Sequence, residues 1–242
     1  MTTTAPQNTG YQSYHAWKGW ENPFTCPPAL ADYYAAEFAG IALRGARLLE
    51  IGFGNGEFLA WASEQGGLVA GSEITAESIA AATARGIALV AADFEDHAAE
   101  GAAFDIIVGF DVFEHLPAAK IAAKLTAIAA MLAPGGWLVL RFPNGQSPFG
   151  LAPQHGDATH VTVLSCAKIE QYAAGLPLVT HRYGGAARAR GRGFAQKLVR
   201  MLRYALRDMH MALLRFTYAN KTEYEPVVTL VMRRTDDGAP DT

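Results

Sequence analysis

A glycine-rich segment, LLEIGFGNGEFLAW at residues 48–61, constrains the fold of this chain more than any other part of the sequence. An apolar run ends in the acid Glu50, and Gly52, Gly54 and Gly56 follow at every second position, directly before a helix-like segment. Glycine has no Cβ, so it accepts positive φ and lets the backbone approach a ligand closely. A strand, a tight glycine turn and a helix N-terminus form a cradle for a nucleotide-like ligand. The segment therefore predicts an α/β fold with a ligand site at this turn.

Composition sets the size and class of the protein. The chain has 242 residues, 50% of them hydrophobic and 18% charged, which suits one globular domain with a full core. We expect a single domain over residues 1–242, with an aromatic N-terminal cap (1–27), a cofactor-binding core (46–144) and an acceptor-side part (145–234). The net charge of -3 gives no overall reason to expect a nucleic-acid partner.

The cysteines and the N-terminus make the cytoplasm the default compartment. Cys26 and Cys166 lie far apart and form no CxxC pair, so we expect small buried side chains rather than a disulfide or a zinc site. The first ten residues lack the basic and apolar regions of a signal peptide. No run of about 18 apolar residues occurs, so we expect no transmembrane helix.

Strand-like and helix-like segments alternate from residue 46 onward. The expected strands are nearly continuous apolar runs, as burial on both faces of a parallel sheet requires. They cover residues 47–52, 67–74, 87–93, 104–111, 135–144, 179–185 and 226–234. The expected helices cover residues 28–43, 57–66, 75–86, 117–132, 165–174 and 194–216, with an irregular loop between residues 150 and 163. Right-handed crossovers between such strands give a parallel sheet with helices on both faces.

Acidic and aromatic residues stand where three of the expected strands end. In this class of fold the ligand binds at the carboxyl ends of the strands, so these residues are candidate contacts. They are Glu73 and Ile74 after the second strand, Asp93 and Phe94 after the third, and Phe110 and Asp111 after the fourth. A carboxylate can accept hydrogen bonds from two ribose hydroxyls, and an acid beside an aromatic ring can hold an adenine. The plainer alternatives are that Glu73 caps the following helix and that Phe94 is a core residue.

The order of these motifs resembles that of the class I S-adenosylmethionine-dependent methyltransferases. E-x-G-x-G-x-G at residues 50–56 differs from the dinucleotide pattern G-x-G-x-x-G and is similar to motif I of that family. GSEI resembles motif II, AADF the adenine motif, FDIIVGFDVFEHLP motif IV and LAPGGWLVLRFPN the next strand, so the resemblance covers residues 46–144. It implies a three-layer, Rossmann-like α/β fold with a seven-stranded, mostly parallel sheet and an antiparallel last strand. An N-terminal cap and a C-terminal basic helical insertion complete the expected architecture.

The resemblance also implies S-adenosylmethionine as the cofactor and a role for each motif. The residues it assigns are Glu50, Gly52, Gly54 and Gly56 for the methionine part, Glu73 for the ribose with Ile74 beside it, Asp93 and Phe94 for the adenine, and Phe110 and Asp111 next to them. The sequence GFDVFEH replaces the N-P-P-Y motif of enzymes that methylate nucleobase amines, and so resembles the small-molecule O-methylating branch.

Some members of that branch bind a divalent metal at E-x-x-E-H positions. Asp111, Glu114 and His115 occupy the equivalent positions here. We expect Glu114 and His115 to cap a helix and pack on the cofactor instead, so we predict no metal.

The loop after the fifth strand holds the candidates for catalysis. Methyl transfer to a hydroxyl needs an aligned acceptor and benefits from a base that takes its proton. Asn144, His155, Asp157 and His160 fall within 17 residues at the cofactor end of the sheet. We predict His160 or His155 as the base and Asp157 as the residue that orients it. A loop anchor, a metal site and catalysis by proximity alone are the open alternatives.

The same loop gives the expectation for the acceptor. FPNG…HGDATHVT resembles bacterial methyltransferases of polysaccharide and lipopolysaccharide gene clusters. That resemblance implies a hydroxyl of a sugar, a glycan or a related small molecule, which could be phosphorylated or lipid-linked. The aromatic stretch YQSYHAWKGW at residues 11–20 would stack on a sugar ring if it folds over the strand ends, with plain packing as the alternative. The rival functions are an RNA or tRNA methyltransferase, a cofactor-binding module without catalysis and a nicotinamide-dependent oxidoreductase.

The expected helix at residues 194–216 concentrates positive charge. Ten of the 20 Lys and Arg residues fall between Arg182 and Lys221, and Asp208 is the one acid in that window. The apolar stripe of this helix consists of Phe194, Leu198, Met201, Leu202, Ala205, Leu206, Met209 and Leu213, and another face carries Lys197, Arg200, Arg203 and Arg207.

Several partners fit such a helix. It could lie on an anionic membrane at the inner face, or it could clamp the phosphates of a substrate; RNA is the least expected partner. The plainer alternative is that the apolar stripe packs on the domain or on a second subunit and leaves a solvated basic face. The oligomeric state stays open.

Overall fold

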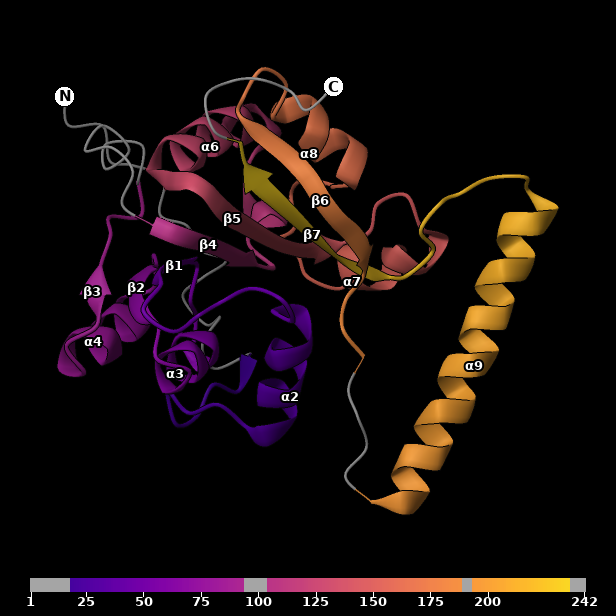
Figure 1. Cartoon of the computed structure of the whole chain (residues 1–242), viewed down its shortest axis with the longest axis horizontal. Helices are drawn as coiled ribbons and strands as arrows, with labels where there is room; N and C mark the ends of the chain where they lie inside the picture. The colour runs from indigo at the N-terminus through magenta and orange to yellow at the C-terminus, as the bar shows by residue number, and fades with distance from the viewer. Residues whose placement is uncertain (1–17, 94–103, 189–192, 236–242) are drawn as a thin grey trace.

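A seven-stranded sheet forms the centre of the protein in a computed structural model that describes residues 18–93, 104–188 and 193–235 (Figure 1). The strands are β1 (Arg47–Ile51), β2 (Leu68–Ser72), β3 (Ala88–Leu89), β4 (Phe104–Phe110), β5 (Leu132–Pro143), β6 (Leu178–Gly185) and β7 (Val227–Arg234). They lie in the order β3-β2-β1-β4-β5-β7-β6. β7 runs antiparallel to β5 and β6, and the other neighbouring strands are parallel. The Rossmann-like sheet with an antiparallel last strand is confirmed.

Helices cover both faces of this sheet. The α-helices beside it are α2 (Pro28–Glu37), α3 (Glu57–Glu64), α4 (Ala76–Ala84), α6 (Ala118–Met131) and α8 (Cys166–Tyr172). Ile121 of α6 and Ile169 of α8 share one hydrophobic core with Leu49, whereas Tyr34 of α2 and Phe58 of α3 share another with Leu48. Successive strand residues point to opposite faces, so the apolar run of β1 fills both cores.

Two elements are shorter than expected. α2 ends at Glu37 rather than at residue 43, and Gly40 with φ of +89° turns the chain away from the helix axis. β3 consists of two residues at one edge of the sheet. Beyond it, the amide of Val90 donates to the carbonyl of Gly71 on β2 at 2.9 Å, and the hydroxyl of Ser72 donates to the carbonyl of Ala91 at 3.2 Å.

The loop after β5 contains helical turns that the sequence analysis did not predict. η3 (Pro148–Gly150) begins after Ser147, whose hydroxyl accepts the amide of Phe149 at 3.1 Å. α7 (Leu151–His155) follows directly. This short helical segment leads the chain back toward the carboxyl ends of the strands.

The described part of the N-terminal cap lies over the glycine turn, which is one of the two arrangements considered for its aromatic residues. The amide of Phe24 donates to the carbonyl of Asn55 at 2.8 Å. Arg85 of α4 donates to the carbonyl of Pro23 at 2.8 Å, and its guanidinium lies 5.1 Å from the centre of the Phe24 ring. Residues 1–17, with most of the aromatic stretch, lie outside the described part of the chain.

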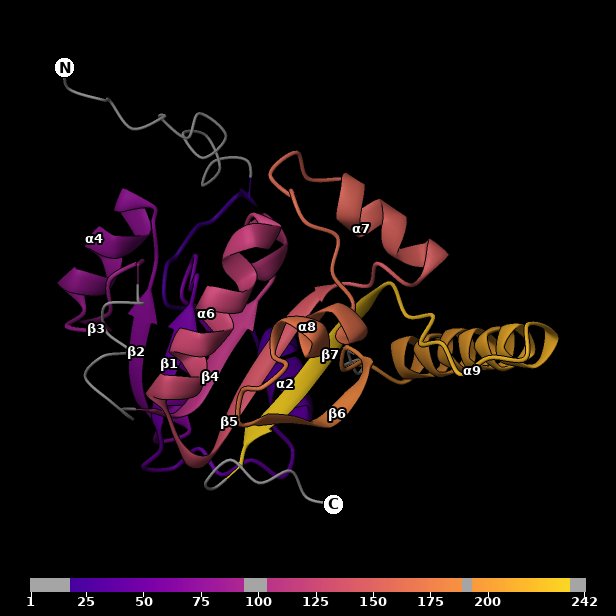
Figure 2. The same cartoon turned by 90° about the horizontal axis from the view of Figure 1, so that it is seen from above.

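α9 (Phe194–Thr217) is inserted between β6 and β7 and projects from the domain (Figure 1 and Figure 2). The expectation that the apolar stripe packs on the domain is wrong, because Leu206 is 62% exposed and Met209 65% exposed. The charged side of the helix faces the body instead, where Arg207 pairs with Glu225. In the described ranges, no helix is both long enough and apolar enough to cross a membrane.

Candidate functional site

The carboxyl ends of β1, β2 and β4 open onto a cavity of about 840 Å³. This volume lies in the upper part of the range for small-molecule sites, roughly 300–1,000 Å³. The predicted cofactor residues that line it are Glu50, Gly52, Gly54, Glu73, Ile74, Asp93, Phe110 and Asp111. Gly56 follows directly as the residue before α3, and Phe94 lies outside the described residues. The topology thus brings the predicted cofactor residues to one edge of the sheet.

The glycine turn leaves no room for side chains. Its three glycines have left-handed backbones, with φ of +66° at Gly52, +53° at Gly54 and +76° at Gly56. A Cβ on Gly52 would lie 2.5 Å from the side chain of Val112, and one on Gly54 would lie 2.8 Å from the ring of Trp20. The turn is therefore a narrow cradle with the cap lying against it.

Glu50 ends β1 as a buried carboxyl at the cavity, 5% exposed. Its Oε2 has no hydrogen-bond partner among the described residues. Burial raises the pKa of Glu50 well above its usual value, and the nearby carboxylates of Glu57 and Glu73 raise it further. A buried acceptor without a donor costs free energy, so this oxygen is placed to receive a polar or cationic group of a ligand.

The carboxylate of Glu73 accepts three backbone N–H groups. Oε2 accepts from Gly54 at 2.8 Å, and Oε1 accepts from Ile74 at 2.6 Å and from Thr75 at 3.1 Å. These bonds join the end of β2 to the glycine turn and satisfy amides just before α4. Glu73 therefore lines the cavity and bonds the amides of the two residues before α4, although no side chain caps the helix itself; its contact with a ribose stays a prediction.

The segment after β3 borders the cavity on another side. Asp93 has a side chain that is 82% exposed, and it lies 3.5 Å from the Nζ of Lys124. Lys124 is buried on α6 and donates to the carbonyl of Ala92 at 3.4 Å. These contacts hold the beginning of the predicted adenine motif against α6.

The sequence analysis missed Arg141, which holds the end of β4. The Nε of Arg141 lies 3.1 Å from both carboxylate oxygens of Asp111, and its guanidinium lies 4.9 Å from the centre of the Phe110 ring. Asp111 takes a φ of +55°, which is unusual for a residue with a side chain, and the ion pair fixes it there. Burial opposes the charge of Arg141, but Asp111 and Tyr33 together outweigh it and raise the pKa of Arg141 well above its usual value. The signal was available: one cation stands within the apolar strand LVLRFP.

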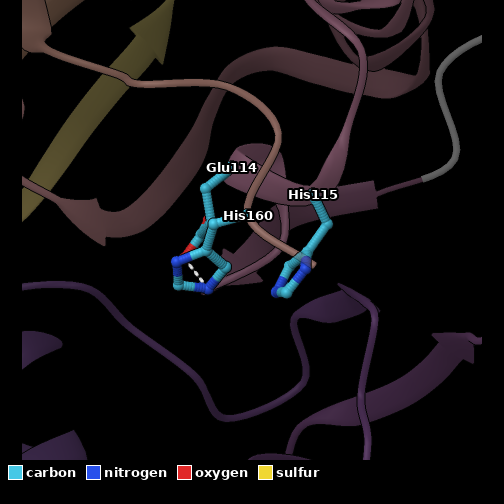
Figure 3. Close-up of side chains that lie close together, drawn as sticks. All are labelled: Glu114, His115 and His160. Atoms are coloured by element: carbon cyan, nitrogen blue, oxygen red, sulfur yellow. Dashed lines mark ion pairs between the residues drawn. The ribbon is translucent and has the colours of Figure 1, made fainter. Parts of the chain in front are cut away.

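Glu114, His115 and His160 lie side by side next to the cavity (Figure 3). One ligand-type atom from each lies within 4.8 Å of the others. Nδ1 of His115 is 3.2 Å from the carbonyl oxygen of Thr159, and Nδ1 of His160 is 3.0 Å from that of Gln154. A carbonyl only accepts, so both rings carry a proton on Nδ1, and the neutral form of either ring has its lone pair on Nε2. These donor types, held by backbone carbonyls, are also those that could hold a divalent metal.

Two carboxyl groups flank Nε2 of His160. The Oε1 of Glu114 and the Oδ2 of Asp157 each lie 3.9 Å from it. Glu114 is fully buried, and neither of its carboxyl oxygens has a hydrogen-bond partner among the described residues. Burial raises the pKa of Glu114 well above its usual value, and the nearby carboxylate of Asp111 raises it further. Burial opposes the charge of Asp157, but hydrogen bonds from Thr159 hold the pKa of Asp157 below its usual value. The cluster thus joins one carboxyl group whose pKa is raised to another whose pKa is lowered.

The structure brings two of the three predicted catalytic residues together. His160 and Asp157 lie in the cluster, whereas His155 is exposed at the end of α7 and is not among the residues that line the cavity. The ring of His115 meets that of His160 edge-on, with centres 4.6 Å apart, and His115 is the ring that lines the cavity. Burial lowers the pKa of His115, and the neighbouring His160 lowers it further. The sequence analysis missed this position as a candidate base.

The loop that carries His160 is fixed from two sides. The backbone carbonyl of Glu114 accepts the amides of Val161 at 2.9 Å and Thr162 at 3.0 Å. Asn144 is buried and donates to the carbonyls of Glu223 at 2.7 Å and Glu225 at 3.0 Å. Asn144 is therefore an anchor of the loop.

Comparison with known proteins gives one family and a common fold. The model of a methyltransferase domain family matches residues 27–181. No curated protein matches the chain in sequence. Similar solved structures include a SAM-dependent methyltransferase from Archaeoglobus fulgidus, with a TM-score of 0.63 at 15% identity, which covers 92% of this chain and 99% of that one.

Two further solved structures have the same fold. A putative sarcosine dimethylglycine methyltransferase from Galdieria sulphuraria has a TM-score of 0.60 at 17% identity and covers 95% of this chain and 99% of that one. Magnesium protoporphyrin IX methyltransferase from Synechocystis, with bound SAH, has a TM-score of 0.60 at 16% identity and covers 93% of this chain and 96% of that one. The family match extends over more than half of the chain and includes the glycine cradle and the Glu114–His115–His160 cluster. The chain therefore belongs to the methyltransferase domain family and is a class I S-adenosylmethionine-dependent methyltransferase.

Proposed function

We propose that this enzyme methylates a hydroxyl of a sugar, a glycan or a related small molecule. The residues around the cavity fit the cofactor, because a Cβ on Gly54 would collide with Trp20 and because the unpaired Oε2 of Glu50 can accept from an ammonium group. When bound, S-adenosylmethionine would supply a methyl group that is held on a positively charged sulfur. A hydroxyl oxygen can bond to this methyl carbon while the carbon–sulfur bond breaks and the sulfur leaves as a neutral thioether. The protein must align the acceptor and take its proton.

The observation that carries the proposal is the imidazole of His115 at the wall of the cavity. Its lowered pKa keeps the ring neutral near pH 7, and its Nδ1–H···O contact to Thr159 leaves the lone pair on Nε2. A neutral ring with a lone pair can accept the proton of a hydroxyl. We therefore assign the base to His115 rather than to His160 or His155.

His160 and Asp157 have a supporting role in this proposal. The edge-on contact between the two rings restricts the orientation of His115, and the ionised Asp157 favours the positive charge that follows proton uptake. The Oε1 of Glu114 lies 3.9 Å from Nε2 of His160, beyond hydrogen-bond distance, so we assign Glu114 no part in moving the proton. His155 has no part in this arrangement.

A sugar acceptor is supported by the cap side of the cavity. Trp20 and Lys18 line the cavity, and the Nζ of Lys18 lies 3.6 Å from Oδ2 of Asp157 on the opposite loop. An indole ring provides a flat surface for a sugar ring. A lysine there suits a sugar that also carries a phosphate. The resemblance of the HGDATHVT loop to methyltransferases of polysaccharide clusters points to the same acceptor class.

The experiment that tests this proposal is transfer of labelled methyl from S-adenosylmethionine into a bacterial extract. The extract is separated into RNA, soluble metabolites and membrane glycolipids, and Gly54→Arg, which fills the cradle, serves as the blank. Label in the sugar or glycolipid fraction supports the proposal and gives a product to identify. Label in the RNA fraction would replace it with the RNA methyltransferase rival. Cofactor binding without label in any fraction would favour a non-catalytic module.

A further inference from the structure

α9 is an amphipathic helix whose apolar side faces away from the protein. Residues recur toward the body at three- and four-residue spacing, and these are half-buried or buried: Arg200, Tyr204, Arg207, Met211 and Arg215. Arg207 donates to Glu225 at 2.9 Å, and Arg215 lies 3.2 Å from Glu223. Each residue of an α-helix turns by about 100°, so the apolar stripe occupies the opposite side. The usual arrangement, with apolar side chains inward and charges outward, is reversed here.

The outward side is broad and strongly apolar. Phe194 is 85% exposed at one end and Phe216 is 84% exposed at the other, while Leu206 and Met209 between them are 62% and 65% exposed. A contiguous apolar surface of this kind on a soluble domain marks a surface that another apolar phase covers. The helix therefore has a partner that the chain itself does not provide within its described residues.

The charges on α9 indicate the chemistry of that partner. The helix carries five Lys or Arg residues and one Asp, a net charge of +4, whereas the whole chain carries -3. Lys197 and Arg203 are exposed and lie on opposite edges of the apolar side. Cations at both edges of an apolar face allow a helix to bury that face among acyl chains while the charges reach lipid phosphates. We propose that α9 lies in the plane of an anionic lipid surface, with the apolar stripe immersed in it.

A second copy of the chain fits this side less well. Two copies that joined the apolar sides of their α9 helices would bring the exposed cations Lys197 and Arg203 of both copies close together, which disfavours the pair. Helix pairs also bury a narrow seam at a repeat of seven, such as Val199, Leu202, Leu206, Met209 and Leu213 would form, whereas the apolar side of α9 also includes Phe194, Leu198 and Met201 beside that seam. Electrostatics and shape therefore both favour a lipid surface.

The surface also extends toward the cavity. The ring of Phe149, 42% exposed, lies 5.9 Å from that of His210 on α9. The chain then continues through α7 to Val161, which is 63% exposed and lines the cavity. A membrane contact through α9 would thus place the cavity next to the lipid surface. This last point rests on the proposed function, since it deepens the acceptor class to a glycan carried on a lipid.

Vesicle sedimentation with the full chain tests the proposal, without cofactor or acceptor, so that its result is independent of methyl transfer. The protein should sediment with vesicles that contain phosphatidylglycerol and stay in the supernatant with phosphatidylcholine alone, and added salt should weaken the binding. Leu206→Glu should reduce binding about tenfold or more, because a charge enters the immersed side. Leu68→Glu is the matched control, since Leu68 is also 62% exposed but lies at the far end of β2. Thermal unfolding midpoints confirm that both variants fold.

Three results would overturn the proposal. One is a protein that remains in the supernatant with anionic vesicles. Another is equal binding by Leu206→Glu and Leu68→Glu, which would exclude the apolar stripe from the contact. The third is a dimer in sedimentation velocity, without lipid, that Leu206→Glu converts to a monomer and that vesicles do not dissociate, because the occupant would then be a second copy.

Discussion

Two regions of the molecule bury carboxyl groups in opposite ways. On α2, Glu37 is fully buried and both of its carboxyl oxygens accept hydrogen bonds. Oε1 accepts from the amide of Ala187 at 2.6 Å and the hydroxyl of Thr229 at 2.8 Å, and Oε2 accepts from Arg182 at 3.2 Å. At the cavity, Glu50 has one oxygen without a partner and Glu114 has two, among the described residues.

The difference separates groups that hold the fold together from groups kept for chemistry. Glu37 links α2 to β6 and β7 across more than 140 residues of sequence, so its bonds stabilise the tertiary structure. An unpaired buried acceptor costs about 1–3 kcal/mol, which a folded protein retains where a ligand or a proton will use it. The region around Glu37 should therefore control stability, and the region around Glu50 and Glu114 should control binding and turnover.

The largest effect is expected for His115→Ala, at the cavity. Removal of the base should lower kcat by roughly 10²–10⁴-fold and leave cofactor affinity unchanged, because a hydroxyl acceptor then has no group to take its proton. His155→Ala, which removes an exposed histidine at the end of α7, is the control and should keep full activity. Steady-state kinetics together with cofactor titration measure both. Normal turnover by His115→Ala would leave the ring as a packing residue and return the base to His160.

A comparable effect, on stability instead of turnover, is expected for Glu37→Ala. The hydroxyl of Thr229 and the amide of Ala187 each lose a buried acceptor, so the free energy of unfolding should fall by about 2–5 kcal/mol. Urea denaturation measures this change, and the folded fraction should bind the cofactor with wild-type affinity. A variant that keeps its stability but loses cofactor binding would reverse the distinction between the two regions.

The opposite sign is expected for Glu50→Gln. The folded-state pKa of Glu50 lies above the unfolded value of roughly 4.3–4.5, so its contribution to stability is present below that pH and is lost as pH rises through the folded pKa. Glutamine cannot ionise, so the variant does not lose this stability. Between the unfolded and the folded pKa of Glu50, its free energy of unfolding should exceed that of the wild type by up to about 1.4 kcal/mol for each pH unit. It should also bind the cofactor more weakly. Urea denaturation at several pH values measures the gain, with the exposed Glu77→Gln as control, and an equal slope in both variants would contradict the prediction.

The sheet and the cradle were predictable because local sequence determines them. The apolar runs of β1 and β4 and the alternation of their faces follow from burial on both sides, and the left-handed turn at Gly54 requires glycine. The candidate site was predictable only as a set of residues. Whether His115 or His160 faces the cavity depends on the amides of Val161 and Thr162, which donate to the carbonyl of Glu114 across 47 and 48 residues of sequence, and no local pattern contains these bonds.

The orientation of α9 was not predictable for a related reason. The spacing of the apolar stripe predicts an amphipathic helix, but periodicity alone cannot say which side faces the domain. Arg207 faces the domain because it pairs with Glu225, which lies in the segment after the helix. Arg188, which precedes the helix, donates to Asp208 within it at 2.8 Å. The same kind of long-range pairing joins Arg141 to Asp111 and escaped the sequence analysis.

The smallest effect is expected from removal of divalent metal ions. Zinc–nitrogen bonds of about 2.0–2.1 Å place tetrahedral ligands about 3.3 Å apart. In the cluster, the Oε1 of Glu114 is 3.9 Å from Nε2 of His160, and the Oδ2 of Asp157 is at the same distance, so both separations are longer than those between tetrahedral zinc ligands. Treatment with a chelator should therefore leave turnover unchanged. Activity that is lost on chelation and restored by one divalent ion would instead make Glu114, His115 and His160 its ligands, and the unpaired oxygens of Glu114 would then be explained by the metal rather than by a proton.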